Sequence, residues 1–303
     1  MNRRNFIGLS AAAFSLHKAH GAELDEPPQL SFGLITDVQY ADAAPEGERH
    51  YRESFPKLQV AVAWLAEKKL SFTLHLGDMI DRDFDSFHTI LPLLEGLGHP
   101  VRQLLGNHDY DVADSEKARV VTTLGMPTDY YQFSRSGVRV VMLDTNDLSI
   151  YKYREGSPQD LESVAMLKKL AEAKLNNAKP WNGGISETQL KWLNSLLEAA
   201  DNAKERVILC GHHPLLPEDG LQAWNGDAVL AVIDRHPCVV ACFSGHHHAG
   251  AEIIRHGIPF ITFKSVLHEP NLNSYSAIHL FSSKLKIEGN GREASRTIAL
   301  RQV

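Results

Sequence analysis

The stretch LSFGLITDVQ, residues 30–39, joins an apolar run to two polar side chains, Asp37 and Gln39. A similar junction of an apolar run with Asp, Asn or His recurs four times along the chain. Its polar segments are GDMID (77–81), GNHD (106–109), GHHP (211–214) and GHHH (245–248), after the runs 72–76, 101–105, 207–210 and 239–243. Such runs are typical of buried strands, and in open α/β sheets ligands bind beyond the carboxyl ends of the strands. We therefore expect the five segments to meet in one cleft.

The side chains that would meet there carry carboxylate oxygens, amide oxygens and imidazole nitrogens. So many buried donors and acceptors would lack partners without a cation, so a metal site is the simplest interpretation. A two-metal hydrolase needs one ligand that touches both ions, and a carboxylate can give one oxygen to each. The expected ligands are Asp37, Gln39, Asp78 and His248 for one ion, and Asp78, Asn107, His212 and His246 for the other, with Asp78 shared.

This ligand set predicts hydrolytic chemistry. A water shared by two divalent cations loses its proton near neutral pH, which gives a bridging hydroxide that can attack phosphorus. His108 follows the ligand Asn107 directly, so we expect it to border the metal centre and to protonate or hydrogen-bond the leaving oxygen. Asp81 would orient its ring. The alternative is that His108 is a structural hydrogen-bonding residue.

Composition and length set the outer limits. The chain has 303 residues, of which 43% are hydrophobic, and we expect one domain over residues 23–303 because no Pro/Gly/Ser-rich linker divides the polar segments. The formal net charge of −6 gives no global basic field for nucleic acid. No apolar stretch reaches the roughly 18 residues of a membrane span, so we expect no permanent membrane anchor. The sequence leaves the oligomeric state open.

The first 22 residues predict an export signal. Arg3 and Arg4 precede a short apolar stretch, residues 6–16, which leads to small residues ending at Gly21 and Ala22. This pattern is typical of a bacterial twin-arginine signal, with cleavage after Gly21 or Ala22 and a periplasmic destination. A disordered amphipathic tail is the alternative.

Three cysteines, Cys210, Cys238 and Cys242, are an odd number, so they cannot form a complete disulfide framework. We expect them to pack in the core, and a bridge between Cys210 and Cys242 is the alternative.

The motifs Asp-x-Gln, Gly-Asp-x-x-Asp, Gly-Asn-His-Asp, Gly-His-x-Pro and Gly-His-x-His, in this order, resemble those of the calcineurin-like metallophosphoesterases. The resemblance implies an α/β (α+β sandwich) fold, in which two mixed β-sheets pack face to face and are flanked by helices. It implies the same metal ligands, and a leaving-group role for His108. The first motif departs from the commonest pattern, which has His where this chain has Gln39. An amide oxygen in place of an imidazole gives the ion next to Gln39 harder ligands, which favours Mn²⁺ or Mg²⁺ over Zn²⁺. Fe and Zn²⁺ are the alternatives.

The segment DVQYAD, residues 37–42, is similar to the first motif of manganese-dependent ADP-ribose/CDP-alcohol diphosphatases. Further matches extend from about residue 30 to residue 292. This resemblance implies hydrolysis of the phosphoanhydride in ADP-ribose or in CDP-alcohols such as CDP-choline. The alternatives are a phosphodiesterase or phosphomonoesterase acting on another exported phosphate ester, and a non-catalytic scaffold.

Three side chains are candidates for contact with a nucleotide-type substrate. The planar fork of Arg82 could meet a distal phosphate, and Tyr40 and Trp224 could stack on a base. A solvated surface position for Arg82, and core or rim positions for the two aromatic residues, are the alternatives.

Overall fold

A computed structural model describes residues 26–302 of the protein, so the predicted export signal lies outside the described residues. The helices are α1 (Ser54–Ala66), α2 (Asp85–Ile90), α3 (Val120–Thr123), α4 (Pro158–Glu172), α5 (Glu187–Ala203) and α6 (Gly226–Ile233). Three 3₁₀ helices are η1 (Leu91–Leu97), η2 (His108–Tyr110) and η3 (Lys117–Arg119). None of the described helices is long and apolar enough to cross a membrane.

Within residues 26–302, twelve strands form two sheets of six strands each. The first sheet has the order β12-β11-β10-β1-β2-β3, and its strands are β1 (Leu30–Ile35), β2 (Thr73–His75), β3 (Val101–Gln103), β10 (Ser274–Leu280), β11 (Lys284–Gly291) and β12 (Arg296–Ala299). The second has the order β4-β5-β6-β7-β9-β8, and its strands are β4 (Tyr131–Arg135), β5 (Val138–Met142), β6 (Arg206–Cys210), β7 (Val239–Ser244), β8 (Ala251–Arg255) and β9 (Ile258–Thr262).

Both sheets are mixed. Strands β1, β2 and β3 run parallel, as do β5, β6, β7 and β9, whereas β10, β11 and β12 pair antiparallel with their neighbours. The hairpin β8–β9 and the pair β4–β5 close the edges of the second sheet. The predicted architecture of two mixed sheets is confirmed.

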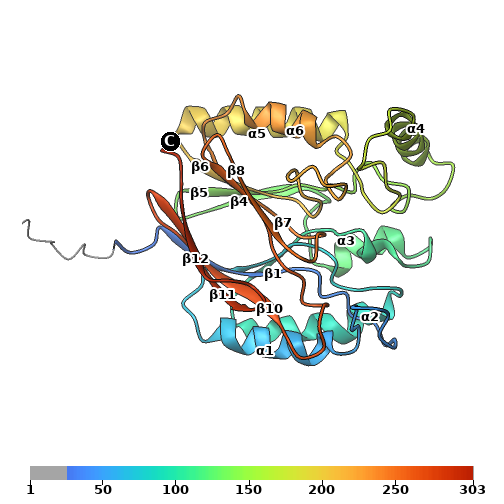
Figure 1. The fold of residues 1–303 in the computed structure, drawn as a ribbon, viewed down its shortest axis with the longest axis horizontal. Coiled ribbons are helices and arrows are strands. Elements are labelled where there is room, and N and C mark those ends of the chain that lie inside the picture. The colour runs from blue at the N-terminus through green and yellow to red at the C-terminus, as the bar shows by residue number, and fades with distance from the viewer. Residues whose placement is uncertain (1–25, 303) are drawn as a thin grey trace, which may run out of the picture.

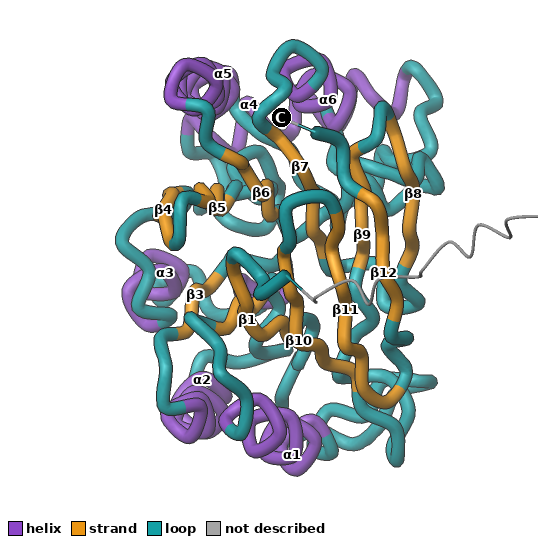
Figure 2. The backbone as a smooth tube through the Cα atoms, turned by 90° about the vertical axis from the view of Figure 1, so that its left-hand side faces the viewer, coloured by secondary structure: helices purple, strands orange, loops and turns teal. Residues whose placement is uncertain are grey.

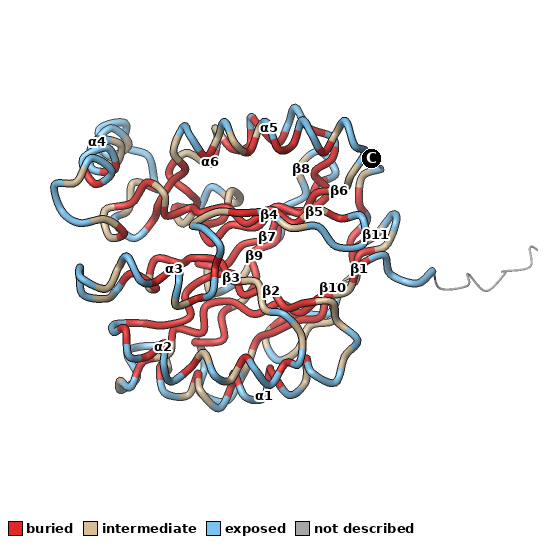
Figure 3. Tube along the Cα trace, turned by 180° about the vertical axis from the view of Figure 1, so that it is seen from behind, coloured by how far each residue is buried: buried red, intermediate tan, exposed pale blue. Residues whose placement is uncertain are grey.

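The main core lies between the sheets. Phe32 and Leu34 of β1 belong to the same buried cluster as Ile208 of β6 and Phe243 of β7. Helix α1 covers the outer face of the first sheet, while α5 and α6 cover that of the second (Figures 1 and 2). Buried backbone runs along both sheets, and the exposed positions gather on the outer sides of the helices (Figure 3). The fold is therefore a four-layer arrangement of helix, sheet, sheet and helix.

Local signals explain where the helices begin. The Ser186 hydroxyl accepts a hydrogen bond from the Gln189 N–H and caps α5, but the Gln189 side chain turns to the carbonyl of Asp144, so only half of a capping box forms. Helix α1 has no such cap, because Ser54 is already helical and its hydroxyl donates to the carbonyl of His50. Pro92 coincides with the change from α2 to η1.

All three cysteines lie in the described part of the chain, and each is a buried free thiol. Leu209 is opposite Cys242 in the β6–β7 ladder, and Cys210 is opposite Phe243. Because Cys210 and Cys242 are one residue out of register, their side chains point to different faces of the sheet. The expectation of core packing is confirmed.

A buried cation ties the loop after β5 to the rest of the fold. The Lys152 ammonium, with 5% of its side chain exposed, donates to the carboxylates of Asp129 and Asp144, and Asp144 is fully buried. Asp144 also accepts from the backbone N–H of Asn146. The pairing keeps this carboxylate compensated in the interior.

We expect Lys152→Met to lower the free energy of unfolding by about 3–5 kcal/mol, because the Asp144 charge would stay buried without its partner. Urea unfolding followed by circular dichroism measures the change. Lys191→Met is the matched control: it removes an exposed i,i+4 pair with Glu187, and should alter stability by about 0.5 kcal/mol at most. Equal effects of the two variants would contradict this role of Lys152.

Candidate metal centre

The loops that follow β1, β2, β3, β6 and β7 meet at one edge of the two sheets. Ligand-type atoms of Asp78, His212 and His246 all lie within 4.8 Å of one another. Asp78 is central, because its Oδ2 is 3.2 Å from His212 Nε2 and accepts from Gln39 Nε2 at 2.8 Å. The structure thus brings together side chains that are far apart in the sequence, such as Gln39 and His248, which are separated by 209 residues.

Asp37, Gln39 and His248 lie on one side of Asp78. His248 Nε2 is 3.4 Å from Asp37 Oδ1 and 3.4 Å from Gln39 Nε2. Asn107, His212 and His246 lie on the other side: Asn107 Oδ1 is 3.2 Å from His212 Nε2 and 3.0 Å from His246 Nδ1. Asp78 therefore stands between two groups of ligand-type atoms, as the sequence predicts for a shared ligand.

Each of two imidazoles uses its other ring nitrogen for orientation. His212 Nδ1 is 2.8 Å from the carbonyl of Leu76, which leaves Nε2 facing Asp78. His246 Nε2 is 3.0 Å from Asn182 Oδ1, which leaves Nδ1 facing Asn107. Partners of this kind fix the tautomer and the ring plane of a metal-ligating histidine.

The backbone of this edge adopts unusual conformations. Asp37, Gln39, Asp78 and His246 have φ of 52°, 44°, 58° and 65°, a left-handed region that few non-glycine residues occupy. Such strain persists where the surroundings impose it and is concentrated at functional sites. At Gly245, a Cβ would lie 2.5 Å from Asp37 Oδ2 and 2.2 Å from Thr36 Oγ1, so only glycine lets the β7 loop approach the β1 loop.

The electrostatics favour ionised carboxylates. Burial by itself raises the pKa of Asp37, but the hydrogen bond with His248 and the charge of His212 hold it below its ordinary value. Burial also opposes ionisation of Asp78, yet the nearby His212 and His108 charges hold its pKa well below the usual range. For His246, burial and the neighbouring His213 and His212 lower the pKa well below the ordinary value, so its ring is neutral. Carboxylates and neutral imidazole are the forms that bind cations. Burial favours the neutral ring of His212 as well, but the charge of Asp78 raises its pKa to about 9, so His212 would give up a proton when a cation binds.

One orphaned atom supports a cation site. Gln39 is fully buried, and its side-chain Oε1 has no hydrogen-bond partner among residues 26–302. A buried acceptor without a partner is costly, and coordination of a cation would satisfy it. The donor set of carboxylate and amide oxygens with imidazole nitrogens fits divalent metals such as Mn²⁺.

His108 borders this centre from the adjoining 3₁₀ turn η2. Its backbone N–H donates to Asp78 Oδ1 at 2.8 Å. Its Nδ1 is 2.7 Å from Asp111 Oδ2 and 3.3 Å from Asp81 Oδ2, so Asp111 makes the closer contact and Asp81 does not orient the ring alone. Although burial favours the neutral ring, the charge of Asp78 and the Asp111 hydrogen bond raise the pKa of His108 to about 9.

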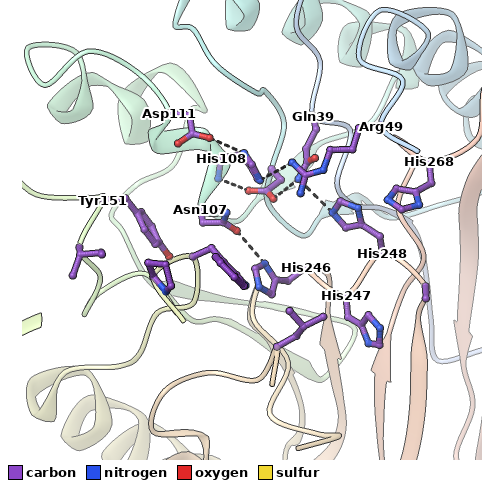
Figure 4. Close-up of a pocket in the computed structure, with 16 residues that line it drawn as sticks. Gln39, Arg49, Asn107, His108, Asp111, Tyr151, His246, His247, His248 and His268 are labelled. Carbon is purple, nitrogen blue, oxygen red and sulfur yellow. Dashed lines mark hydrogen bonds and ion pairs between the residues drawn. The ribbon is translucent and has the colours of Figure 1, made fainter. Parts of the chain in front are cut away.

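A cavity of 790 Å³ opens above these residues, and it is within the roughly 300–1,000 Å³ range of ligand pockets. Gln39, Asp78 and Asn107 line it on one side, together with His246 and His248. The remaining lining residues form its walls and are Arg49, His108, Asp111, Ile150, Tyr151, Pro180, Trp181, Leu221, His247, Ala249 and His268. Figure 4 shows His108, Asn107 and His246 around this space, with Arg49 beside His108 and Tyr151 on the opposite side.

The cavity is lined by other residues than the three predicted substrate contacts, Arg82, Tyr40 and Trp224. The prediction for Trp224 is wrong, because its side chain is 2% exposed and its indole N–H donates to the carbonyl of Lys179. Tyr40 packs against Phe55, with ring centroids 6.0 Å apart. The Arg82 guanidinium binds Glu46 at 2.7 Å and Tyr51 at 2.8 Å, so it is already paired.

Residues 30–250 match the sequence model of the calcineurin-like phosphoesterase family, which is most of the chain. The chain belongs to this family. A relative from Oryza sativa subsp. japonica, named manganese-dependent ADP-ribose/CDP-alcohol diphosphatase, is 32% identical, and the alignment covers 88% of this phosphoesterase and 93% of the relative. A Homo sapiens relative of the same name is 29% identical over 88% and 92%. The crystal structure of a dimetal phosphatase from Danio rerio superposes with a TM-score of 0.82 at 28% identity, covering 90% of this phosphoesterase and all of the other chain.

Sequence reasoning assigned no role to two residues that position the candidate ligands of this phosphoesterase. The Asp109 carboxylate accepts from the backbone N–H groups of Gly106, Met79 and Asp78 and joins two ligand loops. Asn182 faces His246, as described above. Asp109 could have been found from its place directly after Asn107 and His108. Asn182 does not follow an apolar run, so the pattern that identified the ligands does not identify it.

We expect Asn182→Ala to weaken metal binding by about 10- to 100-fold, because His246 would lose the acceptor that orients its ring. Calorimetric titration of the metal-free protein with Mn²⁺ measures the affinity. The matched control is Asn176→Ala, whose side chain binds the carbonyl of Glu218 and the amide of Gln222 instead. If Asn182→Ala bound Mn²⁺ with unchanged affinity, Asn182 would not be needed to position His246.

Proposed function

We propose that this phosphoesterase hydrolyses the phosphoanhydride of nucleoside diphosphate-linked small molecules, such as CDP-choline and other CDP-alcohols, and ADP-ribose. The observation that carries the proposal is the cavity, in which the candidate metal ligands face an aromatic and apolar wall. The names of the relatives from rice and human support the same substrate class and Mn²⁺ as the cation. A simple phosphate monoester would make no use of that wall.

Seven side chains would hold two divalent ions. Asp37, Gln39 and His248 would complete one shell, Asn107, His212 and His246 would complete the other, and Asp78 would contribute to both. Bound there, two cations activate water as a nucleophile at neutral pH and stabilise negative charge on phosphoryl oxygens. The protein's own contribution is to hold these ligands in fixed directions.

Two cationic donors face the place where the phosphates would lie. Arg49 Nη1 is 3.4 Å from His108 Nε2, and both side chains line the cavity. Asp81 Oδ2 already lies 3.7 Å from Arg49 Nη1 and 3.3 Å from His108 Nδ1, and the oxygens of a diphosphate would add acceptors for both side chains on the cavity side. His108 would donate to the leaving oxygen while Asp111 and Asp81 hold its other ring nitrogen.

The opposite wall would bind the rest of the nucleotide. Trp181 is 49% exposed, and it lines the cavity with Pro180, Tyr151 and Leu221. An exposed indole offers a flat apolar face on which a base can stack. Tyr151 is held in place by the hydrogen bond of its hydroxyl to Asn146 Oδ1 at 2.6 Å.

The decisive test is turnover of CDP-choline, ADP-ribose, a cyclic nucleotide and p-nitrophenyl phosphate with Mn²⁺ supplied. We expect kcat/KM to be highest for the two diphosphates and turnover to stop when EDTA is added. Recovery on addition of Mn²⁺ is the control for irreversible inactivation. Equal or faster hydrolysis of the aryl phosphate, or turnover that is indifferent to EDTA, would reject the proposal.

We expect Asp78→Asn and His108→Ala to fail in different ways. Asp78→Asn should abolish turnover and lose both ions, because a shared charge is removed. His108→Ala should keep its metal content and lose less than the roughly 10²–10⁴-fold typical of a general acid, because a phosphate is a good leaving group. Mass spectrometry measures the metal content of each variant, and kcat measures its turnover. Loss of metal from His108→Ala would show that His108 is not merely an acid.

We also propose that residues 1–22 direct the folded domain, residues 23–303, to the periplasm by the twin-arginine route. The support is the sequence, with Arg3 and Arg4 before a short apolar stretch. The test is fractionation of a bacterium that expresses the full chain and a variant with Arg3→Lys and Arg4→Lys. We expect the double variant to stay in the cytoplasm, and the same distribution for both would reject the signal.

A further inference from the structure

An apolar groove runs beside α4, outside the candidate metal centre. Its volume is 610 Å³. Helix α4, which supplies most of its lining, stands at the periphery of the molecule, at the same end as α2 and α3 (Figure 1). The residues that line it are Ile150, Glu155, Gly156, Asp160, Leu161, Val164, Leu167, Lys168 and Ala171.

The apolar side chains of this groove are exposed on an ordered helix. Leu161, Val164 and Lys168 follow one another at helical spacing, with Leu167 and Ala171 beside them, so they share one face of α4. Leu161 is 59% exposed and Val164 is 47% exposed. Exposed apolar groups gathered in a groove are a feature of binding sites.

The groove adjoins the cavity that holds the candidate metal ligands. Ile150 lines both of them, so the two share one apolar wall residue. Two of the groove's three charged groups have partners within the chain: the Asp160 carboxylate accepts from the N–H of Gly156, and Lys168 Nζ is 4.0 Å from Glu172. The third, Glu155, is exposed to solvent at the groove's edge. What the groove offers a ligand is therefore mainly aliphatic surface.

We propose that the α4 groove binds an aliphatic chain carried by the substrate. The proposal rests on the proposed function and names a substrate class for it: a nucleoside diphosphate whose second phosphate is esterified to a long-chain alcohol. With the diphosphate at the metal centre, the chain passes over Ile150 and lies along Leu161 and Val164. Water adds to one phosphorus, the bridging P–O bond breaks, and the products are a nucleoside monophosphate and an alkyl phosphate.

A series of P¹-adenosine P²-alkyl diphosphates with ethyl, hexyl and decyl chains tests this. The measurement is kcat/KM with Mn²⁺, at concentrations where light scattering detects no micelles. Because each methylene buried in the groove adds favourable transfer free energy, we expect kcat/KM to be at least about tenfold higher for the decyl than for the ethyl ester. A ratio near one, with both esters turned over, would overturn the groove proposal and leave the proposed function intact.

Two variants test whether a preference for the decyl ester over the ethyl ester arises from the α4 groove. Leu161→Asp and, separately, Val164→Asp should bring the decyl-to-ethyl ratio close to one, since a carboxylate beside the chain opposes its burial. Val60→Asp is the matched control, because Val60 is an apolar residue of α1 that is 56% exposed and does not line the groove. Its ratio should equal that of the unmodified protein.

Other outcomes would reject the proposal in recognisable ways. An equal fall of the ratio in Val60→Asp would show that the effect does not come from the groove. A dimer that Leu161→Asp converts to a monomer in sedimentation would assign this face to an interface between copies of the chain. Hydrolysis of p-nitrophenyl phosphate but of neither nucleotide ester would overturn the proposed function, and with it the substrate class argued here.

Discussion

Two carboxylates, Asp37 and Asp78, are buried completely and close together, and the arrangement of the surrounding loops follows from this constraint. Their charges are costly in the interior unless donors or cations surround them. The protein supplies donors from several directions. Asp37 accepts from the N–H of His246 at 3.1 Å, and Asp78 accepts from the N–H of His108 at 2.8 Å. Each carboxylate therefore attaches one loop to another before any cation binds.

These contacts also join the two sheets. Asp37 and Asp78 follow strands of the first sheet, whereas His212 and His246 follow strands of the second. Backbone bonds reinforce the link, since the N–H groups of Val266 and Leu267 donate to the carbonyls of Thr36 and Asp37. A cation bound between ligands from both sheets would thus stabilise their packing as well as the site, so metal affinity and folding stability are coupled.

The sequence predicted the strand ends because each depends on a local pattern that repeats five times. An apolar run followed by a polar residue is visible without knowledge of the fold, and the parallel strands bring those ends to one edge. The cavity wall has no such pattern. Trp181 and Trp224 are both aromatic residues in loops, yet Trp181 is 49% exposed and Trp224 is 2% exposed. The difference arises from tertiary contacts, such as the bond from the Trp224 indole to Lys179, which no periodicity encodes. Arg82 and Arg49 illustrate the same limit, since only the folded chain shows which arginine faces the cavity.

The structure explains why the sequence identifies the candidate metal ligands but not the residues of the cavity wall. The wall is built from the segments after β5 and after β6, and polar contacts remote from the carboxylates hold them. Asn182 Nδ2 donates to the carbonyls of Asn177 and Gly220, which joins the two segments and at the same time turns Asn182 Oδ1 toward His246. The wall touches the ligand loops at a few polar contacts, such as that of the Trp181 carbonyl with His213 Nε2 at 3.2 Å. Asn182 is the contact that reaches a candidate metal ligand directly, so a change there alters both the cavity wall and the direction of His246.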